Sequence, residues 1–385
     1  MPESKAPQLA FALNRAIAKL EKYAPALGDQ IYHWVDKNDI LWTNGTGWTD
    51  GFWGGLLWLV YEHTGDKKWM EMARGAQHWM DDRLDAGLIN DHDMGFRYSL
   101  TSVADFVNTG SREARQYAIQ AARVLAARYN AKGQFIQAWN PRPTNTPEHN
   151  RELLGKAIID CMMNQPLLWW ASQVTGDKKY AEIAHAHSHT SMEVFYRKDG
   201  SSYHTFNFDH ETGERLCGKT HQGYADESTW SRGHAWGLYG FALAYTCTGA
   251  PEYLQKAREA AQWWLANTPA CAVPPWDFNA SEENRHLVDT SAALCAACGL
   301  FEIARHVDAE EAATYRAFAE QACLTVNEKY LQSEAHVGLV NHGVSSLPHG
   351  RGITVNLIYN DYFYIEALLR SQGRFLFHWC PNPVV

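Results

Sequence analysis

No segment of this sequence is strongly basic, and this absence excludes one class of partner. The 385 residues include 34 Lys and Arg against 43 Asp and Glu, which gives a formal net charge of -9 and a pI near 6.0. A protein that binds nucleic acid concentrates positive charge on one surface to neutralise the phosphates. We therefore expect no nucleic-acid partner.

Long apolar runs are also lacking. No stretch approaches the roughly 18 consecutive apolar residues that a membrane-spanning helix needs. The N-terminal segment 1–25 has no basic stretch followed by an apolar one, which is the pattern of a secretory leader. We expect no membrane association and a cytoplasmic location.

Cysteine is present but scattered. Cys295 and Cys298 form a C-x-x-C pair inside an alanine-rich segment, and no second Cys pair or His pair follows at the spacing of a zinc site. This setting is typical of a buried core helix. The sequence therefore predicts reduced thiols, and neither a metal nor another cofactor.

Aromatic residues, in contrast, are abundant. The chain contains 16 Trp, 18 Tyr and 15 Phe. Some of them belong to the core, but Trp and Tyr also combine a flat apolar face with a polar tip. This combination suits a protein that stacks its side chains against sugar rings.

A pattern of helix, turn and helix recurs along the chain. An apolar helix ends at a Thr-Gly or equivalent stop, and an amphipathic helix follows, in segments 57–80, 102–129, 167–192 and 243–265. Glycine directly after the last helical turn is a common stop signal. The four copies carry it at Gly65, Gly110, Gly176 and Gly249. These segments are predicted to be αα-hairpins.

Two further segments complete the pattern. Residues 300–326 resemble the other copies without the glycine, and residues 357–373 form a sixth apolar helix. Six hairpins can close into a ring with apolar inner helices and amphipathic outer helices. The turns are separated by 45, 66 and 73 residues, which is too uneven for a solenoid. We predict an all-α fold, an (α/α)6 barrel, with residues 1–385 as one catalytic domain.

Charged residues recur at a similar distance before each turn. The interval is 15 to 19 residues, about the length of an inner helix, for Asp50, Asp93, Asp160, Arg232 and Asp289. These side chains are therefore predicted to lie near the N-terminal ends of the inner helices, at one end of the ring, which we call the mouth. Helix N-termini stabilise anions, so the mouth suits carboxylates and an acidic ligand. N-capping alone would explain any single one of them.

Two of these acids are candidate catalytic residues. Asp160 lies among apolar residues in "AIIDCMMNQP", and burial of that kind raises the pKa of a carboxyl group, as a general acid at neutral pH requires. The alternative, an N-cap Asp bonded to backbone N–H groups, would lower the pKa. Asp93 lies in "LINDHDMGFRYSL" (88–100), where Asp91 is expected to be a surface or capping residue. Two carboxyl groups facing one mouth are the arrangement of sugar hydrolases.

Other side chains of the same loops are candidates for binding the ligand. Tryptophans that can stack on a sugar are Trp48, Trp139, Trp230 and Trp236. Groups that can donate hydrogen bonds to an anionic ligand are His92, His204, His221, Gln222 and Arg232. Core packing is the alternative for the tryptophans, and a structural role in a β-hairpin is the alternative for His204 and His221.

The motifs that carry these residues resemble a known family. In chain order they are "WTDGFWGGLLWLVYEHTGD", "DHDMGF", "IIDC", "SSYHTF", "THQG" and "STWSRGHAWGLYGFAL". Together they are similar to the unsaturated glucuronyl hydrolases, glycoside hydrolase family 88, from about Trp42 to Arg370. The resemblance implies an (α/α)6 barrel and removal of a 4,5-unsaturated uronic acid from the non-reducing end of oligosaccharides left by polysaccharide lyases.

The resemblance also implies roles for individual residues. Asp160 matches the general acid/base of the family and Asp93 its partner carboxylate. The positions that shape the substrate site are matched by Trp48, His92, Trp139, His204, Gln222, Arg232 and Trp236. The implied reaction is hydration of the C4=C5 enol ether, in which protonation at C4 leaves an oxocarbenium-like centre at C5, water adds there, and the hemiketal opens to release the aglycone.

Segments 140–156 and 341–361 depart from the family pattern, which leaves the parent polysaccharide, the linkage and the sulfation open. In the second, "PHGRG" is expected to be a turn, with contact between Arg351 and an anionic group as the alternative. Three other functions stay open: an unsaturated rhamnogalacturonyl hydrolase, a sugar 2-epimerase that would depend on a pair of histidines, and a non-catalytic sugar-binding ring.

Overall fold

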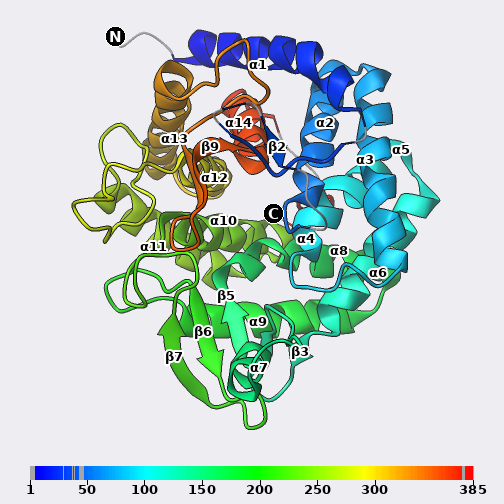
Figure 1. The fold of residues 1–385 in the computed structure, drawn as a ribbon, viewed down its shortest axis with the longest axis vertical. Helices are drawn as coiled ribbons and strands as arrows, with labels where there is room; N and C mark the ends of the chain where they lie inside the picture. The colour runs from blue at the N-terminus through cyan, green and yellow to red at the C-terminus, as the bar shows by residue number, and fades with distance from the viewer. Residues whose placement is uncertain are drawn as a thin grey trace.

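The inner helices form a closed ring (Figure 1). The structure, a computed structural model, describes residues 5–28, 30–36, 38, 40–42, 47–374 and 378–384. The inner ring consists of α2 (Asp50–Thr64), α4 (Met94–Tyr98) with its continuation, α8 (Gln165–Thr175), α10 (Ser231–Thr248), α12 (Thr290–Ile303) and α14 (Ile358–Ser371). Each contacts the next in this order, and α14 contacts α2. The protein is therefore an (α/α)6 barrel, which confirms the fold predicted from the hairpins.

Six outer helices surround this ring. They are α1 (Ala6–Leu27), α3 (Lys67–Asp85), α6 (Arg112–Ala126), α9 (Lys178–Val194), α11 (Pro251–Asn267) and α13 (Ala309–Lys329). Five of them follow their inner helix in sequence. The sixth inner helix, α14, has no outer helix after it among the described residues and packs against α1 from the start of the chain.

Glycine ends four inner helices in the way predicted. Gly65, Gly110, Gly176 and Gly249 have φ angles of 71° to 77° and are the C-cap residues of α2, α5 (Ala104–Thr109), α8 and α10. This left-handed conformation is strained for residues with a Cβ atom. In the hairpin without glycine, Asp308 instead caps the outer helix α13 by accepting from the backbone N–H of Glu310 and Glu311.

The inner helices are buried on all sides, as their uniform apolar sequence predicts. Every residue of α12 is buried, including Cys295 and Cys298, whose thiols are free. The second inner helix is less regular. It runs from α4 through a π-helical segment, η1 (Ser99–Val103), into α5.

Three small sheets lie among the loops. The first contains β1 (Trp34–Val35), β2 (Leu41–Trp42), β8 (Gly343–Ser346) and β9 (Arg351–Leu357) in the order β2-β1-β9-β8. The second pairs β3 (Tyr129–Asn130) with β4 (Phe135–Ile136). The third contains β5 (Lys156–Ile158), β6 (Thr205–Phe208) and β7 (Arg215–Lys219) in that order. β9 leads directly into α14, and β5 leads into the turn before α8. The strands therefore lie at the N-terminal ends of inner helices, at the mouth.

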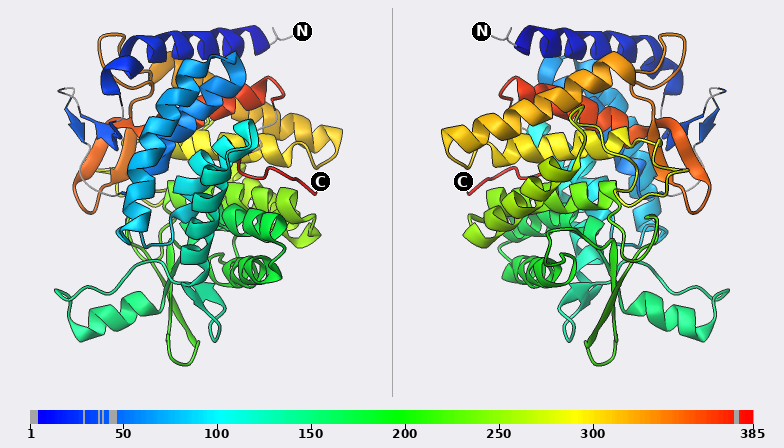
Figure 2. Two further views of the ribbon diagram at one scale, coloured as in Figure 1. Left: turned by 90° about the vertical axis from the view of Figure 1, so that its right-hand side faces the viewer. Right: turned by 90° about the vertical axis from the view of Figure 1, so that its left-hand side faces the viewer.

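The opposite end of the barrel is closed by the C-terminal segment 378–384. Figure 2 shows the end of the chain on the side away from β2, β9 and the short helix α7 (Pro147–Leu154). Trp379 is buried and donates from Nε1 to Glu366 of α14, which also accepts from Arg370 at 2.8 Å. The C-terminal segment thus packs against α14 at the end of the barrel opposite the mouth.

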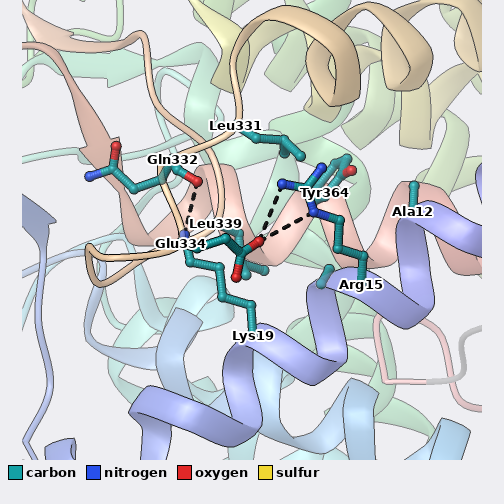
Figure 3. A pocket seen from close by; sticks show the side chains of 9 residues that line it. Ala12, Arg15, Lys19, Leu331, Gln332, Glu334, Leu339 and Tyr364 are labelled. Carbon is teal, nitrogen blue, oxygen red and sulfur yellow. Dashed lines mark hydrogen bonds and ion pairs between the residues drawn. The ribbon is translucent and has the colours of Figure 1, made fainter.

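Polar contacts attach α1 to the loop that follows α13 (Figure 3). Lys19 Nζ donates to the carbonyl oxygens of Gln332 at 3.0 Å and Ser333 at 2.7 Å, and Arg15 pairs with Glu334 at 3.2 Å. None of the described helices is both long and apolar enough to span a membrane.

Candidate active site

The five charged residues singled out by their spacing all lie at the start of inner helices. Asp50 is the first residue of α2, Asp93 precedes α4, Asp160 lies in the 3-10 helix η2 (Ile159–Met163) before α8, Arg232 is the second residue of α10, and Asp289 precedes α12. The predicted placement is confirmed. The capping alternative holds for Asp289, which accepts from Ser291 N at 3.0 Å.

Asp160 lies between two elements that fix its position. β5 ends at Ile158, the η2 turn carries the carboxyl group, and Ile158 rather than Asp160 is the N-cap residue of this turn. The residue is only 9% exposed. Burial raises the pKa of Asp160 to about 7, against the opposing effect of the positive charge on Arg232. The pKa direction expected from its apolar neighbours is confirmed.

His204 faces this carboxyl group across the sheet. Its Nε2 lies 3.7 Å from Asp160 Oδ2, and its carbonyl oxygen accepts from Ile159 N at 3.0 Å. The ring nitrogen Nδ1 accepts from the backbone N–H groups of His221 and Gln222 at 3.1 and 3.2 Å. Because Nδ1 is an acceptor, the neutral ring carries its proton on Nε2, toward Asp160. Burial lowers the pKa of His204 well below its usual value, so the ring stays neutral.

Asp93 is the second buried carboxyl group, with 7% of its surface exposed. It is the N-cap residue of α4, yet its side chain makes no capping hydrogen bond among the described residues. Burial raises its pKa well above the usual value, and so do the negative charges of Asp91 and Asp160, with Arg97 opposing them. His92 Nδ1 lies 3.4 Å from Asp93 Oδ1, and burial lowers the pKa of His92 to about 3. Asp93 and Asp160 thus both retain protons to unusually high pH, and so does Asp50, whose pKa burial raises to about 7.

Arg97, which sequence reasoning missed, connects two loops of the site. Its guanidinium is buried, binds both carboxylate oxygens of Asp91 at 2.7 and 3.0 Å, and donates to Gly47 O at 2.9 Å. Asp50 accepts from Gly47 N at 2.9 Å. Asp91, expected to be a surface or capping residue, is instead an ion-pair partner that also accepts from Asp93 N at 2.9 Å. A charged residue inside an otherwise apolar helix was the signal for Arg97.

Trp48 and its neighbours form an aromatic wall. Trp48 is half-buried, and its ring lies 4.8 Å from Tyr359, 5.5 Å from Phe96 and 6.2 Å from Trp236. Trp236 is fully buried, so it supports Trp48 from behind rather than forming part of the surface. Tyr359, the second residue of α14, was not predicted. The helix predicted over 357–373 includes it, but nothing in the sequence marked this tyrosine as a residue of the site.

Arg232 is placed differently from the expectation of a free anion donor. It is fully buried and pairs with Asp289 through a 2.6 Å hydrogen bond. The same guanidinium donates to the carbonyl oxygens of Val344 and Ser345, both at 2.7 Å. With a fourth contact, to Ser291 Oγ at 3.2 Å, these bonds satisfy most of its hydrogen-bonding capacity. Arg232 therefore holds the β8–β9 hairpin against the start of α10, and its charge acts on Asp160 from there.

The remaining candidates line the two sides of the mouth. Gln222 donates from Nε2 to Ser345 O at 2.8 Å. Trp139 is half-buried and lies 4.7 Å from the ring of His221. Trp230 is buried, and its ring lies 4.4 Å from the ring of His204 at an angle of 43°. His204 and His221 flank the β6–β7 hairpin, as the hairpin alternative predicted, and His204 also faces Asp160.

Two clefts open beside these residues. One, of about 750 Å³, is lined by Trp48, Thr49, Tyr359 and the β8–β9 hairpin with Arg351. The other, of about 630 Å³, is lined by Asp91, Trp139, His221 and residues of segment 140–156. "PHGRG" forms the turn between β8 and β9, as expected, and Arg351 is exposed at its end. Each cleft is large enough for sugar residues.

The Asp160 carboxyl group can donate a proton to a ligand in the mouth. Asp160 Oδ2 is buried and has no hydrogen-bond partner within the described part of the chain. A carboxyl group in that state is available to a ligand, and its raised pKa supplies the proton near neutral pH. The described residues include no group of three or more His, Cys, Asp or Glu placed to hold a metal ion.

Comparison with known proteins is consistent with this geometry. The family model described as Glycosyl Hydrolase Family 88 matches residues 28–268. An unsaturated glucuronyl hydrolase of Bacillus sp. (strain GL1) is 39% identical over 376 residues, which cover 96% of this chain and 98% of the relative. Its crystal structure covers 95% of this chain and 96% of its own, with a TM-score of 0.86. An unsaturated chondroitin disaccharide hydrolase of Streptococcus pyogenes serotype M1 is 35% identical over 95% of this chain and 90% of the relative.

Proposed function

The chain belongs to glycosyl hydrolase family 88, and on this premise we propose that it is an unsaturated glucuronyl hydrolase. It removes a 4,5-unsaturated uronic acid from the non-reducing end of oligosaccharides that polysaccharide lyases produce. The observation that carries the proposal is the buried carboxyl group of Asp160, which keeps its proton near neutral pH, lies beside His204 and has an oxygen without a hydrogen-bond partner among the described residues.

In the proposed reaction Asp160 is the general acid. Its proton adds to C4 of the enol ether, and the positive charge that develops at C5 is shared with the ring oxygen. The Nε2–H group of His204, 3.7 Å from Asp160 Oδ2, favours the carboxylate that remains. Water adds at C5, and its released proton returns to the pair formed by Asp160 and Asp93. The hemiketal then opens, and the oligosaccharide leaves as an alcohol.

The other side chains position the sugar. Trp48 supplies a half-buried ring for stacking, and Trp139 lines the second cleft. Gln222 donates to the carbonyl oxygen of Ser345, which borders the cleft that Trp48 lines. His92 lies beside Asp93. Arg232 and Trp236 act from behind the surface, through Asp160 and Trp48 respectively. We also propose a cytoplasmic location, which the free thiols support.

A panel of unsaturated disaccharides tests the proposed function. Each disaccharide carries the C4=C5 double bond, whose ultraviolet absorbance disappears on hydration, and the panel includes lyase products of glycosaminoglycans, pectin and ulvan. We expect turnover of glycosaminoglycan disaccharides. Turnover of the pectin products alone would indicate the rhamnogalacturonyl activity. Unchanged absorbance across the whole panel would contradict the proposal, since an epimerase or a binding protein leaves the double bond intact.

The pH dependence of kcat/KM should follow the protonation of Asp160. Burial raises the pKa of this group to about 7, so the active, protonated form is present below that pH and is lost above it. About 90% of a group with this pKa is protonated one unit below it and about 10% one unit above. We expect kcat/KM to fall as pH rises through 7, measured in buffers of constant ionic strength. An alkaline limb near the usual pKa of aspartate would contradict the assignment.

A further inference from the structure

The first turn of α4 is capped by a residue from another helix. An N-cap aspartate normally accepts a hydrogen bond from the backbone N–H two or three residues later. Asp93 is the N-cap residue of α4, but within the described residues its side chain does not do so. The Phe96 N–H instead donates to Asn164 Oδ1 at 2.8 Å. The carboxyl group of Asp93 is therefore not used to cap the helix.

Asn164 comes from the turn that carries the other carboxyl group. It is the C-cap residue of η2, four residues after Asp160, and is fully buried. Its Nδ2 lies 3.4 Å from the carbonyl oxygen of Asp160, and its backbone N donates to Cys161 O at 3.0 Å. One side chain thus contacts both the η2 turn and the start of α4.

Gly95 makes this contact possible. A Cβ atom on Gly95 would lie 2.5 Å from Asn164 Cα and 2.8 Å from its Oδ1. Such distances are far below van der Waals contact, so only glycine lets the two segments approach this closely. The sequence "DMGF" therefore contains both the N-cap residue Asp93 and the glycine, Gly95, that lets Asn164 approach close enough to cap the helix in its place.

We propose that Asn164 is a positioning residue that caps α4 in place of Asp93, and so leaves the Asp93 carboxyl group free for the reaction and sets its position relative to Asp160. The inference rests on the proposed function. A carboxylate that accepts backbone N–H groups becomes a weaker base, because those bonds stabilise its charged form. Without the Asn164 side chain, Phe96 N–H would be a buried donor without its partner, and the Asp93 carboxylate, already at the N-cap position, is placed to turn and accept from it.

Asn164→Ala, Asn164→Asp and Gln165→Ala test the proposal. In Asn164→Ala we expect kcat to fall by about 10²-fold, the scale of a small displacement of a catalytic group. KM should change little. The acidic limb of the pH profile, which follows deprotonation of Asp93 as the base, should move to lower pH as Asp93 turns to cap α4, whereas the alkaline limb follows Asp160. Asn164→Asp keeps an acceptor for Phe96 N–H and adds a negative charge. It should therefore move the profile to higher pH.

Gln165→Ala is the matched control. Gln165 is also buried and donates from Nε2 to Cys161 O at 2.8 Å, so its loss should lower the melting temperature to a similar degree. It does not bond to α4 among the described residues, and the pH profile should be unchanged. Equal losses and unshifted profiles in the alanine variants at 164 and 165 would overturn the proposal. If Asn164→Ala does not fold, a profile of Asn164→Asp that is unshifted or moved to lower pH would overturn it.

Crystal structures supply a readout that is independent of turnover. We expect the Asp93 carboxylate of Asn164→Ala within hydrogen-bonding distance of Phe96 N. A carboxylate that keeps its wild-type rotamer would overturn the inference. If the wild-type protein hydrolyses no disaccharide of the panel, the proposed function fails, while this structural comparison still decides whether Asn164 caps the helix.

Discussion

The Asp160→Asn variant should hydrolyse unsaturated disaccharides at a rate at least about 10³-fold lower than the wild-type protein, because an amide cannot donate the proton that C4 requires. Asparagine has nearly the same shape as the protonated carboxyl group, whose pKa is raised to about 7 by burial. The folded state should therefore keep its stability, and binding of the disaccharide should persist. Initial rates, the melting temperature and calorimetric binding constants measure these three properties.

Asp81→Asn is the matched control for this variant. Asp81 is a buried aspartate, 2% exposed, whose pKa burial raises to about 8, but it belongs to the outer helix α3. The same chemical change there should leave kcat and KM at wild-type values. Substantial hydrolysis by Asp160→Asn, or an equal loss in Asp81→Asn, would contradict the role of Asp160 as the general acid.

Arg232→Met should lower the free energy of unfolding more than any other substitution proposed for this protein. The substitution leaves Asp289 buried without its cation and removes the hydrogen bonds that hold the carbonyl oxygens of Val344 and Ser345. Breaking a buried ion pair on one side costs about 3–5 kcal/mol. Chemical denaturation should show this loss, and hydrolysis should decrease with it because the β8–β9 hairpin borders the cleft.

The double variant Arg232→Met/Asp289→Asn separates the charge from the packing. Without the unpaired carboxylate, it should recover part of the stability that the single variant loses. It should not recover hydrolysis, since the hairpin still lacks its hydrogen bonds. If Arg232→Met unfolds at the same denaturant concentration as the wild-type protein, the prediction is wrong and Asp289 has another partner.

The barrel could be predicted because the sequence patterns that indicate it each lie within a short segment of the chain. Thr-Gly stops and helical periodicity need only the residues of one hairpin, and the spacing of Asp93 and Asp160 before their turns follows from helix length. The origin of the sixth outer helix could not be predicted, because α1 meets α14 only after the ring has closed. That residues 1–385 form one domain stays a prediction.

The site was predicted less completely than the fold. Asp160 was singled out by its apolar neighbours, which also determine its burial, and Asp93 by its position before the turn. Their catalytic roles stay predictions. Arg232 was assigned to the ligand because the sequence does not show that Asp289, 57 residues away, accepts its hydrogen bond. Asn164 and Arg97 were missed for the same reason. Asn164 accepts from Phe96, 68 residues away, and Arg97 joins Asp91 of its own segment to Gly47, 50 residues away. No pattern within one segment records the two distant contacts.

The contact between α1 and α14 has a consequence for synthesis of the protein on the ribosome. The first helix ends at Leu27, and the helix that covers it begins at Ile358. At about 5–20 residues per second, roughly 20–60 s pass before the second of them emerges. During that time α2 also lacks its neighbour α14, so a partly made chain exposes apolar helix faces at both edges of an open arc. Chaperone binding to nascent chains should accordingly persist until the last inner helix has been translated.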